Sequence, residues 1–220
     1  MIKKSSFFNL TVQALLAISS ITIISSTASA AGSADNGKDK AATCVACHGS
    51  DGNSANPQWP SLAGQNEVYM MRTLQAFQVP LGENGQVVEG GRYDPVMTSQ
   101  ALALNPEDMV DIGAYFTAQK MAGKVSSPSL VGQGERLYRG GNMEAKVSAC
   151  IACHGPSGRG NAPAGYPSIA GQHAVYTVKQ LQDYRSGARK SDLSGMMRGT
   201  TERLTDDEIN AVASYIQGLR

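Results

Sequence analysis

Two copies of a short cysteine–histidine motif constrain this 220-residue chain more than any other feature. They are Cys44-Val45-Ala46-Cys47-His48 and Cys150-Ile151-Ala152-Cys153-His154. C-x-x-C-H is typical of covalent haem attachment. On a helical turn, residues at i, i+3 and i+4 share one face, so both thiols can reach the haem vinyl groups while the imidazole points at the iron. We therefore predict that Cys44, Cys47, Cys150 and Cys153 bind two c-type haems, and that His48 and His154 are iron ligands.

Other uses of paired cysteines fit the two motifs less well. Zinc ribbons place their two C-x-x-C pairs about 15–20 residues apart, whereas these pairs begin 106 residues apart, at Cys44 and Cys150. A thioredoxin-type redox pair lies beside a βαβ pattern, and no strand-like alternation is found nearby. Two disulfides would leave the histidine after each pair unexplained. Haem attachment is therefore the favoured interpretation.

An internal repeat surrounds the motifs. Pro60-Ser61-Leu62-Ala63-Gly64-Gln65 recurs as Pro167-Ser168-Ile169-Ala170-Gly171-Gln172, and residues 104–116 align with residues 204–216. The latter pair has helical apolar spacing. Asn105-Pro106 favours a helix start, and Thr205-Asp206-Asp207-Glu208 is a capping box. We expect two duplicated domains, at 31–123 and 130–220, joined by a linker at 124–129.

The first thirty residues have the pattern of a secretory signal peptide. Lys3 and Lys4 precede a mostly apolar stretch from Leu10 to Ile24, and Ala28-Ser29-Ala30 is a small-residue cleavage site. The apolar stretch is short and broken by polar residues, which disfavours an uncleaved membrane anchor. We expect cleavage after about Ala30 and an exported mature protein.

Each predicted haem needs a second axial ligand, and methionine is the natural candidate because a His–Met pair is common on haem iron. Met97 and Met197 each lie seven residues before the equivalent Leu104 and Leu204, so the repeat selects them. Met196 stays open as the alternative to Met197. His173 aligns with Asn66 and is expected to be a surface residue. With both axial positions filled, a haem has no vacant site for a substrate, which favours electron transfer over catalysis.

With both C-x-x-C-H sites, both P-S-[LI]-A-G-Q segments, Asp94-Pro95-Val96-Met97 and Gly195-Met196-Met197, the chain resembles the cytochrome c4 family of periplasmic dihaem cytochromes from Gram-negative bacteria. The resemblance implies an all-α chain of two class I cytochrome c folds with His–Met ligation. It also implies that the Pro60 and Pro167 carbonyls accept a hydrogen bond from the proximal histidines. A respiratory electron carrier that is not an enzyme, feeding a terminal oxidase, would follow. The alternatives are a dihaem subunit of a larger oxidoreductase, such as a flavocytochrome, and a dihaem peroxidase.

The two halves differ in charge. Residues 31–123 hold five Lys and Arg against ten Asp and Glu, a net −5, while residues 124–220 hold twelve against eight, a net +4. Such an asymmetry can steer encounters with charged partners, so we expect redox proteins to dock at both ends: a respiratory-chain donor, and a terminal oxidase or other acceptor. Nothing in the composition indicates nucleic acid, and peripheral association with a membrane surface stays open.

Overall fold

The computed structural model describes residues 32–220, and the predicted signal peptide at 1–30 lies outside this range. Within the described part, the regular structure is helical, and the only β-type pairings there are three isolated bridges, one of which joins Arg92 to Arg189. None of these helices combines the length and the apolarity that crossing a membrane requires. The all-α expectation is confirmed for this part of the chain.

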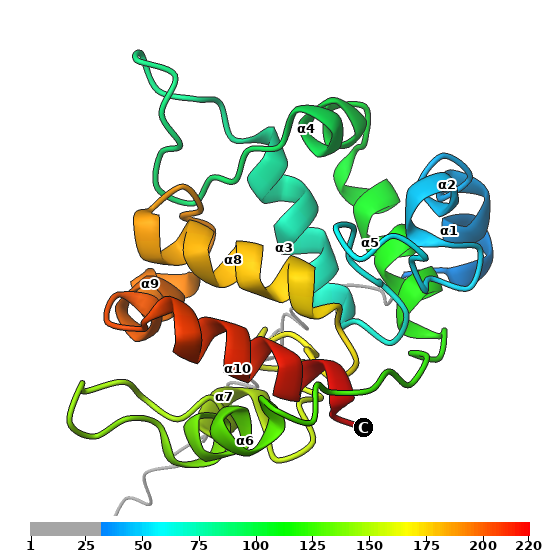
Figure 1. Cartoon of the computed structure of the whole chain (residues 1–220). Coiled ribbons are helices and arrows are strands. Elements are labelled where there is room, and N and C mark those ends of the chain that lie inside the picture. Colours follow the sequence, from blue (N-terminus) through cyan, green and yellow to red (C-terminus); the bar gives the residue numbers. More distant parts are fainter. Residues whose placement is uncertain (1–31) are drawn as a thin grey trace, which may run out of the picture. The chain divides into compact units, whose positions relative to one another are not determined.

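The helices that the structure describes in the first half are labelled in Figure 1. They are α1 (Ala34–Lys40), α2 (Val45–His48), α3 (Glu67–Gln78), α4 (Pro95–Leu102) and α5 (Pro106–Thr117). The α5 helix begins as predicted: the Asn105 side chain accepts from the Asp108 N–H, and the Asp108 carboxylate accepts from the Asn105 N–H. These two bonds satisfy donors that a helix start otherwise leaves unpaired.

The second half repeats this order. Its elements are α6 (Val131–Gly140), α7 (Ile151–His154), α8 (Ala174–Ser186), a short 3₁₀ turn (Leu193–Gly195), α9 (Met196–Thr201) and α10 (Asp206–Gly218). The packing also repeats, because α6 and α8 contact α10 just as α1 and α3 contact α5. The predicted capping box of α10 is present, between Thr205 and Glu208.

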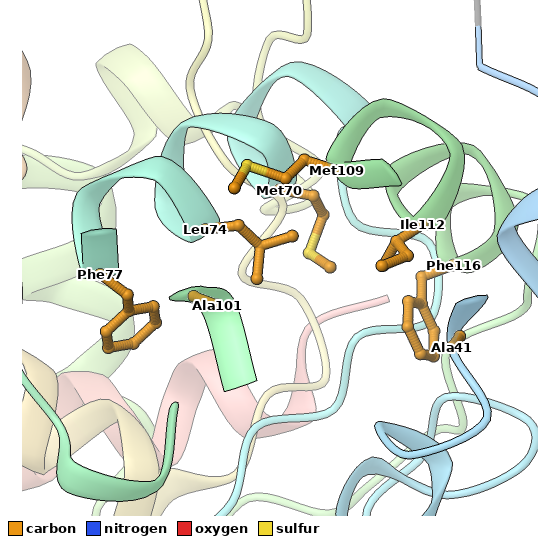
Figure 2. Packing of buried hydrophobic residues seen from close by; sticks show 8 residues of the cluster. All are labelled: Ala41, Met70, Leu74, Phe77, Ala101, Met109, Ile112 and Phe116. Carbon is orange, nitrogen blue, oxygen red and sulfur yellow. The ribbon is translucent and has the colours of Figure 1, made fainter. Parts of the chain in front are cut away.

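Each half has its own hydrophobic core. In the first, α3 contributes Met70, Leu74 and Phe77, which pack with α5 side chains and Ala101 (Figure 2). In the second, Leu137 and Tyr138 of α6 pack against apolar residues of α10. The residues with helical apolar spacing in both closing helices are buried: Met109, Ile112, Phe116, Ile209, Val212 and Ile216.

Glycines allow the terminal helices of each half to approach closely. Gly37 of α1 lies against the backbone of Asp111 in α5, and Gly134 of α6 lies against the backbone of Ala211 in α10. A side chain at either position would meet main-chain atoms, which cannot rotate away. The α1–α5 and α6–α10 contacts therefore have the same physical basis, and each packs the first helix of a half against its last.

Candidate haem-binding sites

Both C-x-x-C-H motifs form a single short helical turn. Cys44 and Cys150 have helical backbone angles and precede α2 and α7, and the N–H of each motif histidine donates to the carbonyl of its first cysteine at 3.0 Å. The turns end at Gly49 and Gly155, whose φ values of +85° and +75° favour glycine. The two cysteines and the histidine of each motif therefore have the i, i+3, i+4 arrangement that the attachment chemistry needs.

Both motif histidines are buried and held in one orientation. His48 is 5% exposed and His154 is 8% exposed. The Nδ1 of His48 bonds the Pro60 carbonyl at 2.8 Å, and the Nδ1 of His154 bonds the Pro167 carbonyl at 3.0 Å. This pairing, which the family resemblance implied, is present in both halves. Burial lowers the pKa of each imidazole, so both rings are neutral near pH 7. Because a carbonyl only accepts, Nδ1 carries the proton and Nε2 keeps the lone pair for a metal.

The cysteines do not have the character of a redox pair. All four are free thiols in the described structure. Burial raises the pKa of the Cys44 thiol, and it raises that of Cys150 to about 11. A reactive dithiol has the opposite shift, towards the thiolate. Residues 32–220 also contain no group of three or more His, Cys, Asp or Glu side chains that could hold a metal ion. The four cysteines therefore fit covalent haem attachment, in which thiols form thioether bonds.

The candidate methionines lie on equivalent helices. Met97 is in the first turn of α4, which Asp94 caps, and it is half-buried against the same core that Cys44 contacts. Met197 is half-buried in α9, but it is not among the residues that pack against the second core, whereas Cys150 is. Met196 is 40% exposed and its sulfur accepts from the Tyr166 hydroxyl at 3.9 Å. The structure therefore brings Met97 and Cys44 to one core and places Met197 deeper than Met196.

His173 is buried, so the expectation of a surface histidine is wrong. Its Nε2 donates to the Ser54 carbonyl of the first half at 2.8 Å. Its repeat partner Asn66, in the first half, donates in turn from Nδ2 to a carbonyl of the second half, that of Tyr166, at 2.6 Å. A polar residue at both positions of the repeat was the signal of a shared role, namely a hydrogen bond to the opposite half.

A pair of arginines at the junction of the halves was also missed. Arg92 and Arg189 each donate to Gln180 Oε1 at 2.8 Å, so the two guanidinium groups lie side by side. Each also donates to a tyrosine of the opposite half: Arg92 to Tyr176 at 2.8 Å and Arg189 to Tyr69 at 3.0 Å. Neither has a carboxylate within ion-pair distance in the described part of the chain.

The positive charge of this arginine pair changes the pKa of a neighbouring tyrosine. Burial by itself would raise the pKa of the Tyr69 phenol, but the positive charges of Arg189 and Arg92 outweigh it and lower that pKa to about 8. Arg189 is itself only 3% exposed. Buried charges are normally paired, so the pair has the character of an anion site. The carboxylates that every haem carries fit this requirement.

The comparisons with known proteins place the chain in a family. The cytochrome c family model matches residues 34–119 and again residues 133–220. Cytochrome c4 of Azotobacter vinelandii is 46% identical over 198 residues, which cover 89% of this chain and 93% of that protein. The chain belongs to the cytochrome c4 family. The crystal structure of reduced recombinant cytochrome c4 from Pseudomonas stutzeri superposes with a TM-score of 0.80 at 44% identity, covering 86% of this chain and 100% of that one.

A second kind of relative is also similar. The thiosulfate dehydrogenase electron acceptor of Stutzerimonas stutzeri (strain A1501) is 35% identical over 179 residues, which cover 80% of this chain and 78% of that protein. Membership of the cytochrome c4 family means two tandem cytochrome c domains with two covalently bound haem c groups. The chain is therefore a dihaem electron-transfer protein.

Proposed function

We propose that this chain is a periplasmic carrier that passes electrons along a respiratory chain towards a terminal oxidase. The observation that supports this most directly is the pair of buried, neutral histidines, each held by a proline carbonyl beside two cysteines. The proposed organisation is a leader at 1–30, domains at 31–123 and 130–220, and a linker at 124–129. Export of the chain fits covalent haem attachment outside the cytoplasm.

Each half supplies a complete set of groups for one haem. Cys44 and Cys47, and likewise Cys150 and Cys153, would form the thioether bonds, while the Nε2 of His48 or His154 would bind the iron. A haem held in this way would supply one-electron redox chemistry. The protein keeps each imidazole neutral and correctly turned, and its core keeps water from the ring. Arg92 and Arg189 offer their charge to the haem carboxylates.

The proposed sixth ligands are Met97 and Met197. Support comes from their equal places in the repeat and from the first turns of α4 and α9, which carry them. Met196 is disfavoured because its sulfur faces the Tyr166 hydroxyl and is more exposed to water. A thioether ligand donates less electron density to the iron than a second imidazole would, so it raises the reduction potential of a haem, which suits a carrier late in a respiratory chain.

A spectroscopic redox titration of wild type, Met97→Ala and Met197→Ala tests these assignments, with Met196→Ala as the matched control. We expect each ligand variant to lose the methionine–iron charge-transfer band of one ferric haem and to lower the potential of that haem alone. Met196→Ala should keep both bands. Loss of a band in Met196→Ala but not in Met197→Ala would reverse the assignment for the second haem.

The charge asymmetry suggests that the two halves meet different partners. The first half carries a net −5 and the second +4 before haem is counted. Oppositely charged patches on donor and acceptor would then accelerate association, and salt would slow it. Electron-transfer rates with both partners should therefore fall as ionic strength rises. If neither rate responds to ionic strength, steering by these charges is refuted.

The alternative function is a dihaem partner or subunit of a dehydrogenase, such as a flavocytochrome. It is favoured by the similarity to a thiosulfate dehydrogenase electron acceptor. Purification of the native protein separates the two proposals. A stable complex of fixed stoichiometry with a catalytic subunit supports the alternative, whereas a free protein that is oxidised rapidly by a haem–copper oxidase supports the respiratory carrier.

A further inference from the structure

Two buried glutamines, Gln65 and Gln172, close the repeated P-S-[LI]-A-G-Q segments that lead into α3 and α8. Each side chain reaches a serine of the opposite half. Gln172 Nε2 donates to the Ser61 carbonyl at 2.9 Å, and the Ser61 N–H donates to Gln172 Oε1 at 3.0 Å. Gln65 pairs with Ser168 in the same way, at 2.7 and 2.9 Å. Each glutamine amide therefore makes two hydrogen bonds to one serine, one with its N–H and one with its carbonyl.

The orientation of both amides is determined by their surroundings. Gln172 Oε1 also accepts from the N–H of His173 at 3.0 Å, and Gln65 Oε1 accepts from the N–H of Asn66 at 2.9 Å. In each glutamine, one amide atom meets two N–H donors and must be the oxygen, while the other meets a carbonyl and must be the nitrogen. The oxygen of each glutamine thus faces the serine N–H.

These serine N–H groups belong to the peptide units whose carbonyls hold the proximal histidines. The peptide between Pro60 and Ser61 accepts from His48 Nδ1 at its oxygen and donates to Gln172 at its nitrogen. The peptide between Pro167 and Ser168 does the same between His154 and Gln65. A continuous hydrogen-bonded chain therefore runs from each imidazole through one peptide to a side chain of the other half.

Such a chain has an electronic consequence. Hydrogen bonds in series polarise one another, so the bond at the Ser61 nitrogen makes the Pro60 oxygen a stronger acceptor. A stronger acceptor at Nδ1 raises the basicity of the ligating imidazole. A more basic imidazole donates more electron density to the iron, which stabilises the ferric state and lowers the reduction potential.

We propose that Gln172 and Gln65 are positioning residues for the proximal histidine of the half opposite their own, so that contact between the halves tunes each haem. The proposal rests on His48 and His154 being the iron ligands. The tuning is crossed: Gln172, in the second half, acts on the haem of Cys44 and Cys47, and Gln65, in the first half, acts on that of Cys150 and Cys153.

The test uses the full dihaem protein with Gln172→Ala and Gln65→Ala, and Gln58→Ala as an exposed control in the first half. Redox titration should show Gln172→Ala raising the potential of the first haem more than that of the second, and Gln65→Ala doing the reverse. In ferrous protein labelled with ¹⁵N-histidine, the Nδ1–H signal of His48 should move in the first variant and that of His154 in the second. Equal shifts of both haems, or shifts no larger than in Gln58→Ala, overturn the proposal.

Two further measurements separate tuning from structural damage. Gln172→Glu gives the Ser61 N–H a stronger acceptor, so the reduction potential of the first haem should fall, opposite to the rise in Gln172→Ala. The Nδ1–H signal of His48 should also move in opposite directions in the two variants, which neither structural damage nor the through-space charge of the carboxylate would produce. In wild type, the Ser61 and Ser168 amides should exchange with deuterium far more slowly than that of Gln58, and comparable rates would also overturn the proposal. Failure of the histidine ligand assignment is distinguishable, because the ¹⁵N-histidine signals of His48 and His154 in wild type would then lack the shifts of an iron-bound imidazole, whatever the glutamine variants do.

Discussion

Replacement of Gly134 by alanine is the sharpest test of how the second half is assembled. An added Cβ would lie 2.7 Å from both the Ala211 carbonyl carbon and the Tyr215 Cβ, with the Ala211 oxygen nearer still. Non-bonded carbons normally lie about 3.5–4.0 Å apart, so α6 and α10 would have to separate by about 1 Å. That movement loosens the packing of Leu137 and Tyr138 against α10. Overpacking typically costs about 1–3 kcal/mol, and we expect about 3 kcal/mol here, more than a hundredfold in the folding equilibrium.

Gly132, in the same helix, is the matched control. Its added Cβ would have only the Arg136 guanidinium nearby, at 3.7 Å. Alanine there should be neutral or stabilise by up to about 1 kcal/mol, because it reduces the entropy of the unfolded chain and favours helix. Guanidinium unfolding of the dihaem protein, followed by far-ultraviolet circular dichroism and haem absorbance, measures both. If Gly134→Ala lies within about 0.5 kcal/mol of Gly132→Ala, the close-crossing argument is refuted.

Two other predictions concern the junction of the halves. Burial lowers the pKa of His173 below its ordinary 6.5, so folding opposes its protonation; its contribution to stability is complete above pH 6.5 and is lost as the pH falls through the folded pKa. His173→Asn, which copies Asn66, should therefore reduce the acid loss of stability in thermal unfolding between about pH 7.5 and 5.5, and an unchanged pH profile would contradict this. Arg189→Gln removes a buried positive charge that disfavours the ferric state, so it should lower a haem reduction potential. The exposed control Arg139→Gln should leave both potentials unchanged. A rise in potential in Arg189→Gln would exclude the proposed role of the arginine pair.

The features that the sequence determined by itself are local ones. The C-x-x-C-H turn is complete within five residues, and its ligand geometry follows from the helical repeat. The capping boxes at Asn105 and Thr205 lie within four residues, so the starts of α5 and α10 could be predicted and are confirmed. The internal duplication then extended the prediction to two domains, because equal patterns in one chain favour equal folds. The methionine assignments rest on the same register and stay predictions.

The tertiary structure alone decided what joins the two halves. Gln172 and Ser61 are 111 positions apart, and His173 and Ser54 are 119 apart. No local periodicity encodes such pairs, since a glutamine or histidine after a turn reads as solvated until a partner is placed against it. The same holds for Arg92 and Arg189, which only the fold brings to one glutamine oxygen. Backbone geometry near a motif follows from neighbouring residues, whereas burial and hydrogen-bond partners follow from the approach of distant segments.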